Sequence, residues 1–337
     1  MAKKVKIKDI AKKVACSPAT VSQAFHNPKL VNRKTRMEIL EACEQLGYVR
    51  RTLRGKRKKI IGITGPTHHV ILGDYYNAVT KSILSSAKEE GINVIIESFD
   101  DKEDTLPYMF SKKVLDGVII LGVISQEHLL MIKQENIPLL ICGRPTSWIE
   151  LNTVWSDGRS GIYEATKHLI GLGHRKIAYV TGSDFFDPIT SDRLDGFKYA
   201  LKEAEISLPE EYIIIGDFDV CKNLISKEAD NILKLKPMPT AIVCESDGIA
   251  YKIYHRLTEA GLKIPKDISI TGFDNLPFPP YINQVKPNIT TVDINLEQLG
   301  KAAVKELLSN IVSPSEVAYR YTLPVKLIVG ETTAQVK

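Results

Sequence analysis

Cysteine is scarce in this chain of 337 residues, which has five cysteines at widely separated positions. Their number is odd and most lie within apolar runs, so we expect reduced core thiols rather than a disulfide framework. No Cys-x-x-Cys pair and no histidine pair at ligand spacing accompanies them, which argues against a zinc site. We therefore expect neither a metal nor a cofactor.

Long apolar runs are also absent, since none approaches the roughly 20 residues that a membrane-spanning helix requires. The N-terminus, Met1-Ala2-Lys3-Lys4, precedes a polar helical pattern and not the apolar segment of a secretory signal. We expect a cytoplasmic protein without a membrane partner. The length and the 44% hydrophobic content fit two or three domains with a sizeable core.

Common catalytic motifs are missing as well. The chain has no Gly-x-x-x-x-Gly-Lys phosphate loop and no Gly-x-Ser-x-Gly nucleophile turn, and only a weak Gly-x-Gly pattern at Gly171. We therefore expect no catalytic residues. An enzyme, for instance a sugar or nucleotide transferase on an α/β body, remains the weaker alternative.

Acidic residues are few at the N-terminal end. Residues 1–59 hold 17 lysines and arginines against four acids, a net charge of +13, whereas the whole chain carries +5 and residues 60–337 therefore carry −8. A basic head on an acidic body is typical of a polyanion-binding module attached to a body with another task. The head alone could also be a mere packing module, but its charge favours nucleic acid.

The stretch 17–27 predicts a short helix with one polar face. Ser17 suits the N-cap position, and Pro18 suits the first helical position, where no backbone donor is needed. Ser22 and Gln23 point outward, and their side chains could reach base edges in a major groove.

Two further helices flank this stretch. The break at Ala15-Cys16 after the preceding helical pattern is short enough only for a tight corner. Asn32 is suited to cap a third helix, which apolar residues including Met37 and Leu40 carry to Gly47. The pattern predicts a helix-turn-helix unit of three helices.

Four segments of this head form one long pattern: Lys6-Ile7-Lys8-Asp9-Ile10-Ala11, Ser17-Pro18-Ala19-Thr20-Val21-Ser22, Val31-Asn32-Arg33-Lys34-Thr35-Arg36 and Leu46-Gly47-Tyr48. The pattern resembles the headpiece of the LacI/GalR (lactose/galactose repressor) family of bacterial transcription regulators. The resemblance implies a homodimer on a palindromic double-stranded DNA operator. The DNA-contact candidates are Ser17, Pro18, Ala19, Thr20, Ser22, Gln23, Asn27, Asn32, Thr35 and Leu53.

Two positions of the head depart from the family pattern. Gln23 replaces an arginine that commonly contacts guanine, and Ala15 replaces a glycine of the turn. Because glutamine pairs best with the adenine edge and arginine with the guanine edge, we expect an operator altered at that base pair.

Residues 49–59 form a basic linker between the headpiece, 1–48, and the body. Such a charge run is commonly a solvated tether. In the resembled family this stretch is a hinge helix whose leucine wedges into the minor groove, and Leu53 matches that leucine. About four residues, roughly one helical turn, are missing beside it. Both the hinge helix and the wedge therefore stay open.

The body, 60–337, alternates short apolar strands with amphipathic helices, which predicts parallel sheets covered on both faces. The series restarts after Asp157, so we expect two half-bodies with a cleft between them. The resemblance implies a periplasmic-binding-protein-like core for effector binding and dimerisation. We expect subdomain N to span about 60–158 plus 290–318, and subdomain C about 159–289 plus 319–337.

Polar residues follow the predicted strands, where ligands bind in open α/β sheets. They are Asp100 and Asp101, Arg144, Thr181 to Asp187, Asp217-Phe218-Asp219, Glu245-Ser246-Asp247 and Asp274-Asn275. Carboxylates, arginine and aromatic rings suit a polyol or a heterocycle, although loops are polar and aspartates cap helices for structural reasons too.

The resemblance extends through the body. Arg193-x-x-Gly196-Phe197 is similar to the segment with the family's effector-binding arginine, and 268–275 to its Gly-Phe-Asp-Asp corner. Ser246 stands where the family usually has asparagine, so the effector is expected to differ. The implied effector-binding residues are Tyr75, Tyr76, Arg144, Arg193, Phe218, Ser246, Asp247 and Asp274. His168 and His174 are better explained as cap and packing residues than as acid or base groups.

These observations favour a transcriptional repressor controlled by a small effector, most simply a sugar, in the cleft. A purine-type corepressor and a phosphocarrier partner are the alternatives within this class. A sugar-binding protein similar to periplasmic receptors is a further alternative, which the basic head disfavours. The tail after Gly330 is short and polar and shows no heptad pattern, so a dimer is expected rather than a tethered tetramer.

Overall fold

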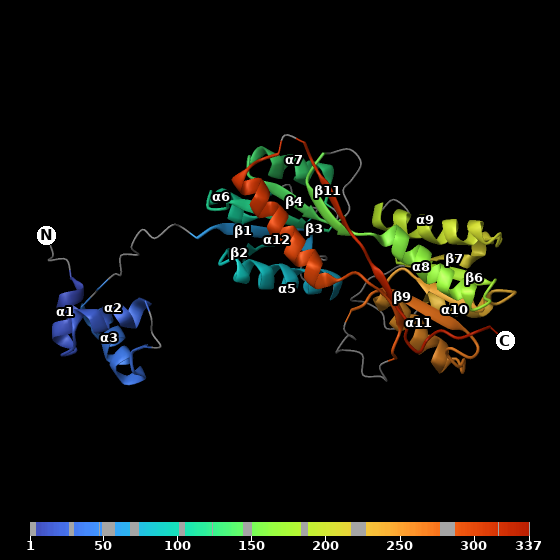
Figure 1. Ribbon diagram of the computed structural model, residues 1–337, viewed down its shortest axis with the longest axis horizontal. Helices are drawn as coiled ribbons and strands as arrows, with labels where there is room; N and C mark the ends of the chain where they lie inside the picture. The colour runs from blue at the N-terminus through green and yellow to red at the C-terminus, as the bar shows by residue number, and fades with distance from the viewer. Residues whose placement is uncertain are drawn as a thin grey trace. The chain divides into compact units, whose positions relative to one another are not determined.

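The chain divides into two compact units, Met1–Arg57 and Lys58–Lys337 (Figure 1). The computed structural model describes residues 5–26, 30–46, 48, 58–67, 74–100, 105–122, 124–143, 150–182, 188–216, 227–276, 287–315 and 317–336. None of the helices in these ranges is long and apolar enough to cross a membrane. The predicted linker, 49–59, lies outside the described residues except for its last two positions.

The first unit is the predicted helix-turn-helix, with α1 (Ile7–Lys13), α2 (Pro18–His26) and α3 (Arg33–Leu46). Both predicted caps are confirmed. The Ser17 hydroxyl accepts from the Thr20 N–H at 3.0 Å, and Asn32 Oδ1 accepts from the Lys34 N–H at 2.7 Å and the Thr35 N–H at 3.2 Å. These bonds satisfy backbone donors that a helix N-terminus leaves without partners.

One small core holds the three helices together. It consists of Ile10, Ala11, Val21, Ala24, Val31, Ile39 and Ala42. The structure corrects the predicted apolar pattern of α3, since Met37 and Leu40 are 47% and 45% exposed. The side of α3 that faces α1 and α2 runs through Ile39 and Ala42, and Met37 and Leu40 lie outside that stripe.

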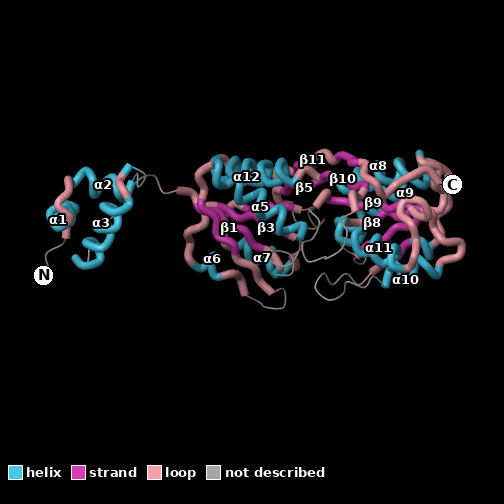
Figure 2. Tube along the Cα trace, turned by 90° about the horizontal axis from the view of Figure 1, so that it is seen from below, coloured by secondary structure: helices cyan, strands magenta, loops and turns pink. Residues whose placement is uncertain are grey.

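The second unit contains two six-stranded sheets, which Figure 2 shows as separate groups of strands. The first has the order β11 (Arg320–Leu323), β5 (Thr153–Ser156), β4 (Leu139–Cys142), β3 (Gly117–Leu121), β1 (Ile60–Thr64), β2 (Asn93–Ile96). The second has the order β12 (Lys326–Ile328), β10 (Thr290–Asp293), β9 (Ser269–Asp274), β8 (Ala241–Cys244), β6 (Ile177–Thr181), β7 (Ile213–Ile215). The same order recurs, which confirms two similar half-bodies.

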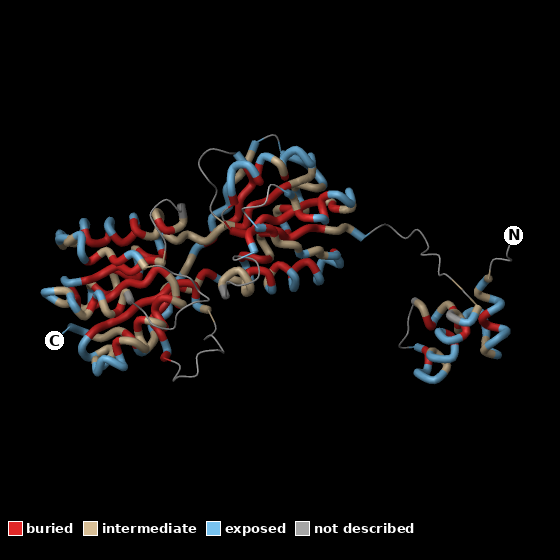
Figure 3. Tube along the Cα trace, turned by 180° about the vertical axis from the view of Figure 1, so that it is seen from behind, coloured by how far each residue is buried: buried red, intermediate tan, exposed pale blue. Residues whose placement is uncertain are grey.

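The pairings are parallel except for β10 with β12, as the apolar strands predict. Successive strand residues alternate between two apolar layers, so both faces of each sheet are covered. Figure 3 shows the buried residues concentrated in the strands and the exposed ones on the outer sides of the helices. The short turn η2 (Glu210–Tyr212) leads into β7.

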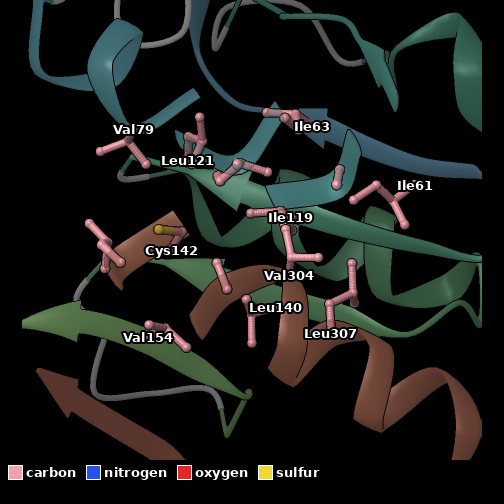
Figure 4. Packing of buried hydrophobic residues seen from close by; sticks show 14 of the residues in the cluster. Ile61, Ile63, Val79, Ile119, Leu121, Leu140, Cys142, Val154, Val304 and Leu307 are labelled. Carbon is pink, nitrogen blue, oxygen red and sulfur yellow. The ribbon is translucent and has the colours of Figure 1, made fainter. Parts of the chain in front are cut away.

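Helices supply the covering layers. In the first sheet α5 (Asp74–Glu89) and α12 (Leu296–Val312) cover one face, and α6 (Tyr108–Ser111) and α7 (Gln126–Gln134) cover the other. Figure 4 shows Val79 of α5 and Val304 and Leu307 of α12 directed at the same strands. In the second sheet α8 (Gly158–Gly171) and α9 (Pro188–Glu203) cover one face, and α10 (Lys227–Lys234) and α11 (Asp247–Glu259) the other.

Two predicted subdomain boundaries are wrong. Residues 290–293 were expected in the first half but form β10, which pairs with β9 of the second sheet. Residues 319–323 were expected in the second half, but β11 pairs with β5 of the first sheet. The chain crosses between the two halves after β5, after β10 and after β11. The second crossing arises because α12 covers the first sheet although β10, which precedes it, belongs to the second. The third arises because β11 belongs to the first sheet and β12 to the second.

Candidate functional site

The second sheet has its topological switch point between β6 and β8, where open α/β sheets bind ligands. Thr181 ends β6, and Glu245 follows β8. One Glu245 carboxylate oxygen accepts from the Thr181 hydroxyl and from the Gly182 N–H at 3.1 Å; the other accepts from the Thr190 hydroxyl at 2.6 Å. Three donors from two elements therefore fix this buried carboxylate beside the crevice.

Arg193 of α9 joins the same cluster. Its Nη1 donates to the backbone oxygen of Glu245 at 2.7 Å, and its Nη2 to Asp274 Oδ1 at 3.2 Å. The two side chains of this ion pair are only 12% and 5% exposed. The guanidinium carbon also lies 3.9 Å from the ring centroid of Phe273, a cation–π contact. Burial, an ion pair and a stacked ring together hold Arg193 in one position.

Asp247 is the first residue of α11, and the charge of Asp274 acts on it. Its carboxylate accepts from the Thr291 hydroxyl at 2.5 Å and from the Leu276 N–H at 2.8 Å. Burial, together with the charge of Asp274, raises the pKa of Asp247 to about 7. Burial raises the pKa of Asp274 to about 6, although Arg193 opposes this shift. The site thus holds two carboxyls that titrate near neutral pH.

The backbone after β9 is strained at the same place. Asp274 has a φ of 104° and Asn275 a φ of 54°, and neither is glycine. Such conformations cost of order 1–3 kcal/mol each and persist where the surroundings hold them, most often at functional sites. Here the ion pair to Arg193 holds Asp274, so the turn aims its carboxylate at the guanidinium.

The first half of the core contributes Tyr75 of α5. Its pKa is raised well above the usual value of 10 by burial first, and then by nearby Cys142 and Asp274, while Arg193 opposes the shift. Tyr75 also packs against the apolar core of the second sheet. Its ring meets that of Tyr76 edge to face, with centroids 4.9 Å apart. Side chains from both halves therefore meet at one place.

The structure brings together four of the eight predicted effector residues: Tyr75, Arg193, Asp247 and Asp274. Tyr76 packs on Tyr75, and the Ser246 hydroxyl caps α11 by accepting from the Ile249 N–H at 3.4 Å. Arg144 and Phe218 lie outside the described residues.

Sequence reasoning missed two threonines that complete this cluster. Thr190 and Thr291 hold the carboxylates of Glu245 and Asp247. Thr181 and Glu245 stood in the strand-end set but were not chosen as effector residues. The sequence does indicate Thr190, because it lies three residues before Arg193 and therefore on the same side of α9.

Lowering the pH should stabilise the core through Asp247. Its folded-state pKa of about 7 lies above the ordinary value of 3.8, so this carboxyl favours folding at low pH, and that contribution is lost as the pH rises from about 4 through about 7. Asp247→Asn should therefore lose less stability than the wild type between about pH 5 and about pH 8. Urea unfolding of the wild type and of the variant at both pH values measures the change in the free energy of unfolding. Equal losses in the two proteins would contradict the prediction.

The headpiece presents the outward side of α2. Ser17, Pro18, Ala19, Gln23 and Asn32 are exposed, and Thr20, Ser22 and Thr35 are partly exposed. The Ser17 and Thr20 hydroxyls lie 2.8 Å apart and form a hydrogen bond. Asn27 and Leu53 lie outside the described residues, so their predicted contacts stay predictions.

The turn before α2 carries strain that glycine would relieve. Ala15 has a φ of 52°, and the Cys16 N–H donates to the Ala11 carbonyl at 3.0 Å, the closing bond of a Schellman turn. Ala15→Gly should stabilise the headpiece by up to about 1 kcal/mol, because the left-handed conformation costs alanine more than glycine. Thermal unfolding of the full chain, monitored by headpiece signals, measures this. A lower melting temperature would show that chain entropy outweighs the strain.

Both predicted packing histidines bind the C-terminal tail. His168 Nε2 lies 3.0 Å from the Thr333 hydroxyl, and His174 Nε2 lies 3.0 Å from the Ala334 carbonyl. Burial lowers the pKa of each, so the neutral form is favoured. The tail is polar as expected, but Thr332 is buried and bonds to Ile270 and Thr290. The tail is therefore part of the second half.

Known proteins share both units of this chain. A model described as bacterial regulatory proteins, lacI family, matches residues 6–51, and one described as a periplasmic binding protein-like domain matches residues 166–333. The chain is 30% identical to the probable HTH-type transcriptional repressor ExuR of Bacillus subtilis over 328 residues, which cover 93% of this chain and 94% of that protein. The chain belongs to the LacI family. It is a DNA-binding transcriptional regulator.

Other known proteins match this chain over most of its length. The HTH-type transcriptional repressor PurR of Vibrio vulnificus is 29% identical over 341 residues, 98% of this chain and 99% of that protein. A LacI family transcriptional regulator of Enterococcus faecium, solved with bound ribose, has a TM-score of 0.70 and 27% identity, and covers 83% of this chain and 100% of that one.

Proposed function

We propose that this LacI-family regulator is a repressor whose operator affinity is controlled by a small ligand between the two halves of the core. The observation that carries the proposal is that Tyr75 of the first half packs against the core of the second half, where the charges of Arg193 and Asp274 act on it. A ligand that contacts these groups touches both halves. It can therefore favour one relative arrangement of the halves over another.

The mechanism follows from the three crossings of the chain between the sheets. They permit the halves to change their angle while each sheet stays intact. In a homodimer on a palindromic operator, that change would alter the spacing of the two headpieces relative to the half-sites. One headpiece contacts too little DNA for a tight specific complex, which supports the dimer. We place the protein with its operator in the cytoplasm and assign it no enzymatic activity.

Two ligand classes are compatible with the relatives. The ribose-bound relative supports a sugar, and the PurR relatives support a purine-type corepressor. A thermal-shift screen with sugars, sugar phosphates and purines separates them, because a ligand that binds only the folded state raises the melting temperature. A hit must also change operator affinity. A hit that leaves operator affinity unchanged would contradict ligand control.

The DNA contact of α2 has its own test. Gln23 is exposed on α2, and we expect it to contact adenine in the operator. Selection from random double-stranded DNA with the full chain should yield guanine at that base pair for Gln23→Arg, with discrimination of about 1–3 kcal/mol. Gln23→Ala, the matched control, should weaken the preference for one base at this pair without creating a preference for another base. An unchanged preferred base in both variants would remove Gln23 from base recognition.

A further inference from the structure

Among the described residues, the candidate site holds more buried carboxyl groups than cationic groups. In this part of the chain, three buried carboxyl groups interact with one guanidinium, that of Arg193: Asp274 forms an ion pair with it, and Glu245 and Asp247 interact with its charge. We propose that the ligand of this site is an amino sugar, a polyol with a protonated amino group, and that sugar acids and sugar phosphates are excluded. The proposal rests on the proposed function and specifies its ligand class.

The hydrogen bonds show which carboxylate is available. Among the residues that the structure describes, Glu245 accepts three donors and Asp247 two, whereas Asp274 accepts one, from Arg193, through Oδ1. No described residue donates to Asp274 Oδ2. An ammonium group offers three donors and a positive charge, so it suits this oxygen better than a hydroxyl does. Tyr75 packs against the second half, where the charge of Asp274 acts on it, and its aromatic ring also favours a cation.

The terminal nitrogens of Arg193 are not available for the paired hydrogen bonds that usually hold an anion. Carboxylates and phosphates are commonly held by two parallel bonds from the terminal nitrogens of a guanidinium. Here Nη1 already donates to the Glu245 backbone and Nη2 to Asp274. An incoming anion would have to displace these bonds and would be repelled by the carboxylate of Asp274. Both terminal nitrogens of Arg193 are therefore already hydrogen-bonded within the protein.

Two buried polar atoms point to a ligand oxygen. Arg193 Nε and the Tyr179 hydroxyl are buried and have no hydrogen-bond partner among the described residues. The charges of Glu245 and Arg193 both act on the Tyr179 hydroxyl, which places it in the same cluster. Buried donors without acceptors are costly, so a ligand hydroxyl that accepts from Arg193 Nε would bind favourably. The expected ligand thus combines an amine with a neighbouring hydroxyl.

Matched ligands test the charge preference. We would measure melting temperatures of the full chain with the neutral, 2-amino, uronate and 6-phosphate forms of glucose, galactose and mannose. The amino form of at least one sugar should give the largest increase, with at least tenfold tighter binding than its neutral form by titration calorimetry. The acids and phosphates should give none. A uronate or phosphate as the best ligand, or no increase with any of the twelve, overturns the proposal.

Two variants locate the effect. Asp274→Asn should weaken binding of the amino sugar at least tenfold and bring it close to the neutral form. Glu245→Gln, which keeps a side chain of the same shape, should weaken it less and serves if the first variant unfolds. Asp195→Asn, an exposed change on the same helix as Arg193, is the matched control and should bind as the wild type does. Unchanged amine preference in both site variants contradicts the proposal.

Operator binding separates this proposal from the proposed function. If the amino sugar binds but operator affinity stays constant, the ligand class stands and ligand control fails. If a sugar acid binds and changes operator affinity, ligand control stands and the amino-sugar class fails. Fluorescence anisotropy with operator DNA chosen by selection measures this for the wild type and Asp195→Asn.

Discussion

Replacing Arg193 with alanine is expected to destabilise the core by about 3–5 kcal/mol, because it leaves a buried carboxylate without its partner. The Asp274 side chain is only 5% exposed, and Arg193 is its one hydrogen-bond donor among the described residues. The substitution also removes the cation–π contact with Phe273. Urea unfolding of the full chain measures the loss, and the ligand-induced shift in melting temperature should disappear.

A double variant is the control for this prediction. Arg193→Met with Asp274→Asn removes both charges of the ion pair, so part of the stability should return, although Glu245 and Asp247 still lose the charge of Arg193. Its ligand response should stay absent, because both proposed ligand contacts are lost. A single Arg193→Ala variant as stable as the wild type would show that the ion pair contributes nothing to the fold.

Replacing Gly196 with alanine is expected to cost about 3 kcal/mol, because the added methyl group would overlap the backbone of α8. A Cβ at this position would collide with the carbonyl oxygen of Arg159 and lie 3.2 Å from the backbone nitrogen of Tyr163. Backbone atoms cannot rotate away, so α8 and α9 would have to separate. Arg193 lies one turn earlier on α9, so ligand affinity should fall with stability.

Gly171→Ala is the matched control, since this glycine also lies in a helix of the same layer. A Cβ there would meet no heavy atom within 4 Å, so alanine should stabilise the protein by up to about 1 kcal/mol through its helix propensity. Urea unfolding of both variants decides the comparison. Equal stability of the two variants would mean that the α8–α9 contact tolerates a methyl group and that Gly196 is not required for close packing.

Local patterns in the chain were enough to predict the helices, the strands and the residues at their ends. Ser17 and Asn32 cap their helices because capping depends on a side chain and the next three backbone amides. Apolar strands between helical segments predicted parallel sheets, because only strands covered on both faces are apolar throughout. Arg193 and Asp274 followed from the family pattern, and the structure places them in one ion pair.

How these elements combine depends on contacts between distant parts of the chain. The predicted boundaries near residues 290 and 318 failed because β10 and β11 are assigned to a sheet by the edge they extend, which depends on contacts far away in the sequence. Thr190 and Thr291 became visible as partners of buried carboxylates only when α9 and β10 were packed together. The hydrogen bonds that both terminal nitrogens of Arg193 donate within the protein also depend on this packing. Local patterns determine helices, strands and caps, whereas long-range packing determines which polar groups keep a free bond for a ligand.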